Sequence, residues 1–262
     1  MGAPVTHSYP TIVWSCGGGT QSAAIAALIV QGKLPKPDLA VMVDTEREKS
    51  GTWEYADAVL IPNLREAGVT LHRVRKSEYA TVDLWAGNGD LLLPVFTNQS
   101  GEQGKLPVYC SDKWKSRVVQ RWLRSQGVES AEQWIGISID EMRRTRFSGL
   151  GWLRNRYPLI EPEFGLTYRR SDCEAEIARL GWPKAPRSAC WMCPNMGDFE
   201  WLEMKTHYPG DFACAVRLER EMRQKDPHAW LHGSCVPLDQ VDFTTQGSLF
   251  EDRSCASGMC FV

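Results

Sequence analysis

The chain has 262 residues, a formal net charge of −2 at pH 7 and 43% hydrophobic residues, which is the composition of an ordinary globular protein. That balance excludes a uniformly basic nucleic-acid-binding protein, and the longest apolar run, residues 23–30, is too short to span a bilayer. No secretory signal precedes that run, so we expect a cytoplasmic protein with no membrane partner, whose nine cysteines are reduced.

The first half of the chain alternates buried strands with helices, which predicts a parallel sheet with right-handed crossovers. The expected strands are 11–16, 38–45 and 70–75, and the expected helices between them are 21–31 and 50–68. A further helix over 111–127 and a strand over 133–140 extend the pattern. We therefore expect an α/β, Rossmann-like fold.

Beyond residue 150 the sequence becomes rich in Pro, Trp, Arg and Cys. We predict two helices there, 171–181 and 197–224, the second broken at Pro209, and an irregular tail over 226–262. The expected organisation is a sheet domain over 1–150 and a Cys-rich, mostly helical region over 151–262.

A run of glycines stands between the first expected strand and its helix. It reads Gly17, Gly18, Gly19, Thr20, Gln21, Ser22. Glycines let backbone N–H groups approach phosphate oxygens, and the helix N-terminus adds partial positive charge. The run does not match GxxxxGK[ST], and Ser22 replaces the last glycine of GxGxxG. A tight turn without a ligand is the alternative.

The second strand ends at Asp44 and Thr45. In an open parallel sheet the carboxyl ends of strands border the ligand crevice, so we expect both residues beside the glycine run. Asp44 would bind a ribose or a metal ion such as Mg²⁺. Capping of the next helix is the alternative.

Four cysteines are candidate metal ligands. Cys190 and Cys193 form a CxxC pair followed by proline, and Cys110 and Cys173 lie upstream. Four thiolates suit a tetrahedral zinc ion or a [4Fe–4S] cluster, and nearby basic residues favour the thiolate form. Unligated cysteines are the alternative.

Together the glycine run, "VDT-E" at 43–46, "GISIDEMRR" at 136–144 and "PRSACWMCP" at 186–194 resemble the phosphoadenosine phosphosulfate (PAPS) reductase-like branch of the PP-loop ATP pyrophosphatase superfamily. Two glycines and the final serine match the SGGxDS loop of that superfamily, while Gln21 replaces its aspartate. The resemblance implies that residues 1–150 bind ATP or adenylyl sulfate, with phosphates on Gly17–Ser22. It also implies that the nucleotide is bordered by Asp44, Gly136, Asp140, Glu141 and Arg143.

The resemblance favours iron–sulfur over zinc, because adenylyl-sulfate reductases bind a [4Fe–4S] cluster through an early cysteine pair and a later CxxC. Here Ser111 follows Cys110, so Cys173 is the expected replacement ligand. If Cys173 does not bind, one iron stays open, which suits sulfide capture. Related reductases also use a nucleophilic tail cysteine. Cys255 and Cys260 are the candidates here, although this tail lacks the family's ECG-x-H pattern; they could instead be a redox pair or metal ligands.

The leading functional hypothesis is ATP-dependent sulfur transfer to a nucleic acid, with adenylation of the acceptor and release of pyrophosphate. The basic segments 113–124 and 143–156 mildly favour DNA or tRNA as the acceptor, and a sulfide or electron donor protein is implied. The alternatives are a sulfonucleotide reductase that releases sulfite and a non-catalytic nucleotide-binding subunit with a structural zinc ion.

Overall fold

The computed structural model describes residues 10–244 and divides into two compact units. Unit 1 is built from Met1–Met42, Ala58–Val74 and Val119–Ala185, and unit 2 from Val43–Asp57, Arg75–Val118 and Pro186–Val262. The boundary expected near residue 150 falls inside unit 1, between two strands that pair with each other. Each unit is therefore assembled from several separate stretches of the chain.

A five-stranded sheet forms the centre of unit 1, in the order β3-β2-β1-β6-β7. The strands are β1 (Thr11–Ser15), β2 (Leu39–Asp44), β3 (Leu71–Arg75), β6 (Ala131–Ile135) and β7 (Leu153–Arg156). The pairings of β1 with β2, β1 with β6 and β6 with β7 are all parallel. The predicted Rossmann-like α/β fold is confirmed, and its strand order reverses between β1 and β6.

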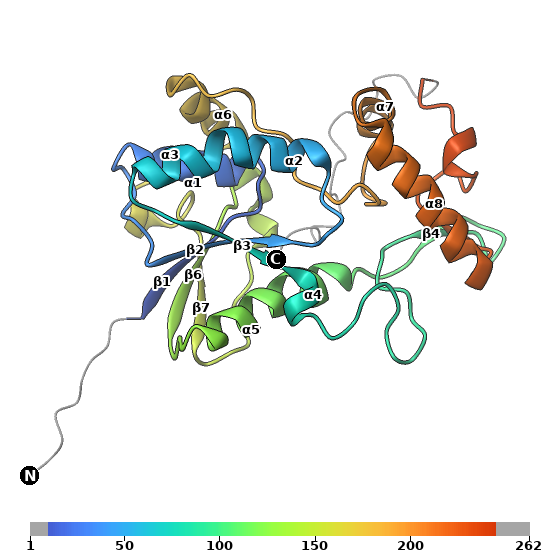
Figure 1. Ribbon diagram of the computed structural model, residues 1–262, viewed down its shortest axis with the longest axis horizontal. Helices are drawn as coiled ribbons and strands as arrows, with labels where there is room; N and C mark the ends of the chain where they lie inside the picture. Colours follow the sequence, from blue (N-terminus) through green and yellow to red (C-terminus); the bar gives the residue numbers. More distant parts are fainter. Residues whose placement is uncertain (1–9, 245–262) are drawn as a thin grey trace, which may run out of the picture. The chain divides into compact units, whose positions relative to one another are not determined.

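Helices cover both faces of this sheet (Figure 1). α1 (Thr20–Val30), α3 (Ile61–Glu66) and α6 (Arg170–Arg179) lie on one face, and α5 (Arg117–Ser125) lies on the other. α1 is buried on nearly every side, and its four alanines keep it thin enough to pack between the sheet and α6. This burial holds the first turn of α1 firmly against the sheet.

Several expected elements differ in detail from the observed ones. The expected helix 50–68 is three segments: α2 (Ser50–Tyr55), a π-helical turn (Ala56–Leu60) and α3, whose first turn contains Pro62. A π-helical turn (Asp112–Ser116) likewise precedes α5. The strand expected over 133–140 ends at Ile135, and a 3₁₀ helix (Ile139–Arg144) follows it. Strand β7 was missed, because its sequence LRNR is mostly polar.

Unit 2 has its own core, built around two helices. α7 (Asp198–His207) and α8 (Pro209–Lys225) meet at Pro209, where the sequence predicted the break. The other elements of this unit are α4 (Lys76–Tyr79), the antiparallel strands β4 (Phe96–Thr97), β5 (Gly104–Lys105) and β8 (Ala229–Trp230), and a 3₁₀ turn at Leu238–Gln240. A short 3₁₀ turn at Pro162–Phe164 belongs to unit 1.

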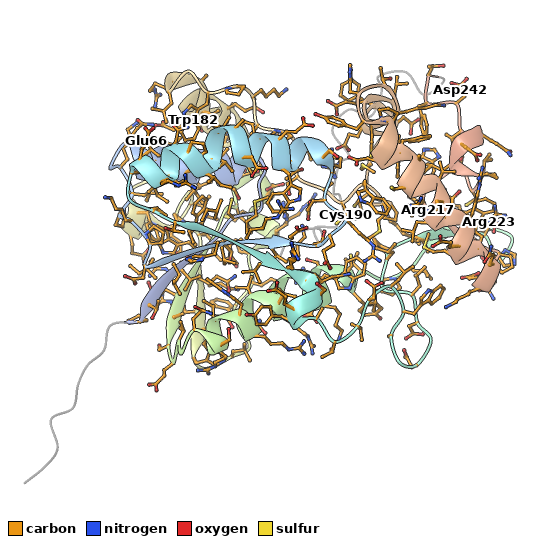
Figure 2. The ribbon with its side chains drawn as sticks, viewed as in Figure 1. Glu66, Trp182, Cys190, Arg217, Arg223 and Asp242 are labelled. Carbon is orange, nitrogen blue, oxygen red and sulfur yellow. The ribbon has the colours of Figure 1, made fainter. Side chains whose placement is uncertain are left out.

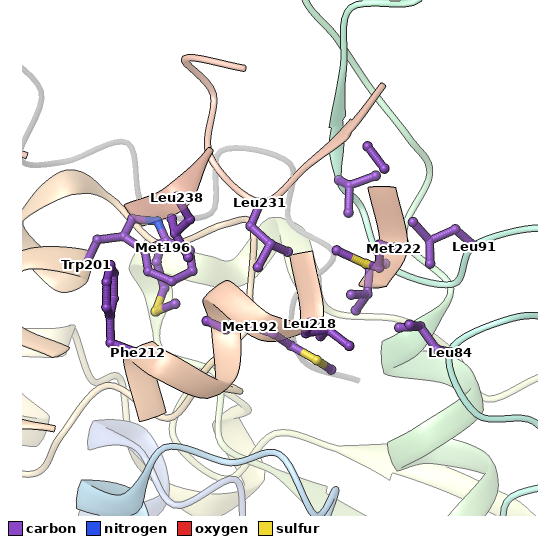
Figure 3. Packing of buried hydrophobic residues seen from close by; sticks show 14 of the residues in the cluster. Leu84, Leu91, Met192, Met196, Trp201, Phe212, Leu218, Met222, Leu231 and Leu238 are labelled. Atoms are coloured by element: carbon purple, nitrogen blue, oxygen red, sulfur yellow. The ribbon is translucent and has the colours of Figure 1, made fainter. Parts of the chain in front are cut away.

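The buried face of α8 follows a helical period, with Phe212, Ala215, Leu218 and Met222 all pointing inward. These side chains pack with Met192, Met196, Trp201, Leu231 and Leu238 (Figure 3). Met192 lies between the two cysteines of the CxxC pair, so core packing anchors that turn. Among the helices between residues 10 and 244, none combines the length and apolar character needed to cross a membrane.

Candidate functional site

The glycine run forms the turn between β1 and α1. Gly18 has a φ of +75°, a left-handed conformation that favours glycine, and Gly19 is the extended residue preceding α1. The first turn of α1 has no acidic residue, and within residues 10–244 no side chain caps it. Its free N–H groups can therefore receive an anion. Two amides of the turn are already used, because Gly17 N–H donates to Ser22 Oγ at 2.8 Å and Gly18 N–H donates to the thiol of Cys16.

The segment that follows β6 lies against this turn. A Cβ atom on Gly136 would lie 3.2 Å from the backbone carbonyl carbon of Gln21, so only glycine fits there without a shift. Gln21 Nε2 donates to Glu141 Oε2 at 3.0 Å, and Glu141 also pairs with Arg144 at 2.6 Å. The structure thus brings Gly136 and Glu141 to the glycine turn, and it directs the Gln21 side chain toward Glu141.

Asp140 and Arg143 occupy different positions from Glu141. Asp140 Oδ2 accepts a hydrogen bond from the backbone N–H of Arg170 at 2.6 Å, so it stabilises the start of α6. Arg170 in turn reaches Thr20 Oγ1 with its Nη2 atom at 3.3 Å. Arg143 is exposed on the 3₁₀ helix. Arg170, which the sequence did not single out for this turn, is a cation in contact with the first residue of α1.

Asp44 and Thr45 lie in unit 2, at and just after the end of β2. Asp44 is buried, and its Oδ1 atom accepts a hydrogen bond from Glu46 N–H at 2.7 Å. Thr45 Oγ1 lies 3.3 Å from Cys190 Sγ. Thr45 is therefore a neighbour of a candidate metal ligand, which its sequence position did not suggest.

The CxxC pair is held by a short antiparallel contact in unit 2. Cys190 (labelled in Figure 2) bridges with Glu48, and Trp191 N–H donates to the carbonyl oxygen of Arg47 at 2.8 Å. Cys193 N–H donates to the carbonyl oxygen of Cys190 at 3.0 Å, which closes the turn. These backbone contacts fix the direction of both thiols.

Charged groups surround these thiols. Burial raises the pKa of Cys190 well above its ordinary value, and nearby Glu48 raises it further, while Lys115 opposes the rise. Burial, followed by the proximity of Cys193, raises the pKa of Cys110 to about 12. Lys115 Nζ pairs with Glu48 Oε1 at 2.8 Å. Although burial favours the neutral amine, Glu48 raises the pKa of Lys115, so Lys115 remains charged beside the thiols.

Three of the four predicted ligands, Cys110, Cys190 and Cys193, lie in unit 2, and Cys193 raises the pKa of both of the others. Cys173 lies in α6 of unit 1, fully buried, and burial together with Asp172 raises its pKa to about 12. In the described part of the chain, no three His, Cys, Asp or Glu side chains are arranged to hold a single metal ion. Cys255 and Cys260 lie outside the described residues.

No protein-family model and no curated protein matches the sequence. The structure matches solved chains, among them the PAPS reductase from Candida auris in a phosphate complex. That match has 16% identity and a TM-score of 0.44, and it covers 69% of this chain and 78% of the other. The U34-tRNA thiolase NcsA from Methanococcus maripaludis with its [4Fe-4S] cluster matches at 14% identity and a TM-score of 0.47, over 92% of this chain and 76% of the other.

The chain is similar in fold to PAPS reductase and to a thiolase. At these identities the likeness is one of fold alone.

Sequence reasoning missed two charged residues beside the thiols, Glu48 and Lys115. Lys115 belongs to the basic run 113–124, which suggested an external polyanion, and Glu48 follows Asp44 by only four positions. Their partner Cys190 is far away in sequence. A mostly buried, unpaired charge is costly, so the pairing of Lys115 with Glu48 is a physical reason for both residues to lie there together.

A cavity of about 740 Å³ in unit 2 is lined by Trp191, which follows Cys190. Its polar wall is an ion-paired group in which Arg47 binds Asp83 through two hydrogen bonds, at 2.6 and 2.9 Å, and Lys76 binds the same carboxylate at 2.5 Å. The hydrogen bonds from Arg47 and Lys76 outweigh partial burial and hold the pKa of Asp83 well below its usual range. Asp83 in this wall therefore remains a carboxylate at neutral pH, next to Arg47 and Lys76.

Proposed function

We propose that this protein is an enzyme of sulfur metabolism that binds an adenine nucleotide, holds an iron–sulfur cluster and transfers sulfur to a nucleic acid. The observation that carries the proposal is the position of the glycine turn. It leads into an uncapped helix N-terminus at the point where the strand order of a parallel sheet reverses. Open α/β sheets bind nucleotides at this point.

The nucleotide phosphates would contact the backbone N–H groups of Gly19 to Ser22, because the Gln21 side chain is directed toward Glu141. Arg170, held next to Thr20, can supply the positive charge that the GxxxxGK[ST] motif obtains from lysine. Asp140 fixes the backbone of Arg170 and so acts on the site through it. These residues all belong to unit 1.

The residues of unit 2 fit an iron–sulfur cluster better than a single zinc ion. Tetrahedral zinc at about 2.3 Å from each sulfur would need thiolates less than about 4 Å apart. Within residues 10–244 no such group of three ligands exists, although Cys193 acts electrostatically on both Cys110 and Cys190. A cluster of four irons spreads its thiolate ligands more widely. When bound, it would supply iron sites that can hold inorganic sulfur.

The chain's own side chains would support this ligand set. Lys115 offsets the negative charge of the thiolates, and Glu48 holds Lys115 in place. Thr45 can donate a hydrogen bond from its hydroxyl group to Cys190 Sγ. This bond acts against the rise in the pKa of that thiol caused by burial. Three thiols would leave one ligand position open. Cys173, Cys255 and Cys260 remain predicted candidates for that position or for sulfur transfer.

The proposed reaction has two steps that balance. In the first, a carbonyl oxygen of the acceptor attacks the α-phosphorus of ATP, and the bond to pyrophosphate breaks. In the second, sulfide from a donor attacks the activated carbon, and AMP leaves with the former carbonyl oxygen. The protein must hold ATP at unit 1, deliver sulfur and admit a nucleic acid.

The test is anaerobic purification followed by iron, zinc and acid-labile sulfide analysis. We expect iron and sulfide together with absorbance near ~400 nm, which is typical of thiolate-bound clusters. Pyrophosphate release from ATP that depends on an acceptor supports sulfur transfer. Sulfite release from adenylyl sulfate would instead show the reductase reaction. A colourless protein that contains zinc and turns over neither substrate would be a non-catalytic nucleotide-binding subunit.

A further inference from the structure

One loop of unit 1 exposes apolar side chains to an unusual degree. Within the described residues six large hydrophobic side chains are exposed, and three of them fall within nine positions: Met142 (58% exposed), Phe147 (104%) and Leu150 (36%). Both faces of the Phe147 ring are open to solvent. The same loop borders a hollow of about 790 Å³ whose floor includes Trp152 and Tyr157.

The charge of this loop has one sign. Residues 142–156 contain five arginines and no acidic residue. Arg144 and Arg156 are committed to ion pairs with Glu141 and with Glu132 and Glu161. Arg143 and Arg146 are exposed and form no ion pair with any residue between 10 and 244. Two uncompensated arginines therefore belong to the same loop as the exposed ring.

The loop is held in place at its centre. Tyr157, which is buried, accepts a hydrogen bond from Arg146 N–H at 2.6 Å and donates its own to the Arg146 carbonyl oxygen at 2.7 Å. Asn155 Nδ2 donates to the same carbonyl oxygen at 3.0 Å. The residue before Phe147 therefore has a fixed backbone, so the loop loses less conformational entropy when it binds a partner.

We infer that this loop is a docking surface for an unpaired stretch of nucleic acid, in which a base stacks on Phe147 and phosphates contact Arg143 and Arg146. Free aromatic faces beside arginines are the means by which proteins bind single strands, since each base offers a π-face and each linkage a negative charge. In a duplex the base faces are already stacked, so Phe147 selects an unpaired segment.

A protein partner fits this surface less well. Three scattered side chains do not form the continuous apolar core of a stable protein interface, which buries about 800 Å² on each partner. The unpaired arginines of the loop favour a strongly negative ligand. Both features are met by a single nucleic-acid strand.

The position of the loop deepens the proposed function on which the inference rests. Met142 and Arg143 belong to the 3₁₀ helix whose Glu141 binds Gln21 of the glycine turn. The surface therefore starts where the proposed nucleotide site ends, within unit 1.

The test uses the full chain and three labelled probes of one mixed sequence: single-stranded DNA, single-stranded RNA and duplex DNA. Binding is followed by fluorescence anisotropy at several salt concentrations. We expect a single strand to bind more tightly than the duplex, and Phe147→Ala to weaken its binding about tenfold or more. The double variant Arg143→Gln with Arg146→Gln should reduce the salt slope by about 1.4, which is 0.7 for each phosphate contact.

Matched controls are available in the same chain. Phe199→Ala removes another exposed phenylalanine, on α7, and Arg65→Gln removes an exposed arginine from α3; neither should change binding. Equal binding by Phe147→Ala and the wild type, preference for the duplex or no binding of any probe would overturn the inference. ATP affinity and iron content measured on the same samples separate this failure from failure of the proposed function.

Discussion

The two units hold their cysteines in opposite ways. Cys16 and Cys173 of unit 1 are buried one by one, and burial raises the pKa of each to about 12 with no second thiol among the causes. In unit 2 the thiols of Cys110 and Cys190 each interact with Cys193 and with a lysine. In the proposed function, unit 1 therefore binds its ligand through backbone N–H groups, and unit 2 binds its ligand through thiol sulfur atoms.

Removal of one thiol from each unit tests this difference directly. We expect Cys193→Ala to lose essentially all iron, because a two-cysteine set does not retain a cluster. Cys173→Ala should keep its iron and lose only the stability of a small packing defect, about 1 kcal/mol. Iron and acid-labile sulfide per chain, after anaerobic purification, are the measurement.

Both variants should keep wild-type affinity for ATP, since neither changes the glycine turn. Full iron in Cys193→Ala would remove this residue from the ligand set. Loss of iron from a folded Cys173→Ala protein would show that the predicted fourth ligand is real, and that the contrast between the two units does not hold.

Most of unit 1 could be predicted from local patterns. The first three strands, the buried helix after the glycines and the order of these elements follow from apolar runs and glycine positions in the sequence. Strand β7 was not predicted because it has no apolar run. It lies at the edge of the sheet, where polar Arg and Asn side chains are tolerated. Gly136 was expected to border the nucleotide, but its packing against Gln21 depends on a contact between residues 115 positions apart.

Unit 2 could be predicted only in part. Its helices and the break at Pro209 follow from sequence, but the unit is assembled from three distant segments. Nothing local signals that Glu48, Lys115 and Cys190 meet, because each belongs to a different segment. The sequence predicted Cys110 and the CxxC pair as members of one ligand set, and this stays a prediction. The placement of Cys173 in the other unit was not.

The glycine turn of unit 1 can be tested by a substitution at Gly18. Gly18→Val should weaken ATP binding by at least about tenfold, or about 1.4 kcal/mol, because a β-branched residue disfavours the left-handed conformation and obstructs the backbone N–H groups. Iron content should stay at the wild-type level. Isothermal titration with ATP is the measurement.

Gly32→Val is the matched control for the glycine variant. Gly32 also has a left-handed φ, of +71°, and a Cβ atom there would meet nothing within 4 Å. It should therefore share the backbone strain and retain ATP binding. Equal ATP affinity in Gly18→Val and the wild type would show that the turn is structural only.

The remaining prediction concerns one buried carboxylate in each unit, Glu176 and Glu219. Glu176 of unit 1 is buried, yet hydrogen bonds from Lys33, Gln31 and Tyr168 outweigh burial and lower its pKa. Glu219 of unit 2 accepts backbone N–H groups of Leu231 and Leu238 at 2.8 Å each, and burial raises its pKa. At neutral pH, Glu176→Gln should cost about 2 kcal/mol of unfolding free energy, since its cations reach solvent and are only partly stranded.

Glu219→Gln should change stability by less than about 1 kcal/mol, because the lost hydrogen bond is offset by removal of a buried charge. The unfolding free energies of the two variants, each relative to the wild type, should depend on pH in different ways. The lowered pKa of Glu176 gives stability above its ordinary pKa of 4.5 that is lost on acidification, so the deficit of Glu176→Gln shrinks as pH falls. The raised pKa of Glu219 makes the wild type lose stability as pH rises through it, so Glu219→Gln gains relative to the wild type. Urea unfolding from pH 4 to 8 tests both, and parallel curves for the two variants would contradict the assigned environments.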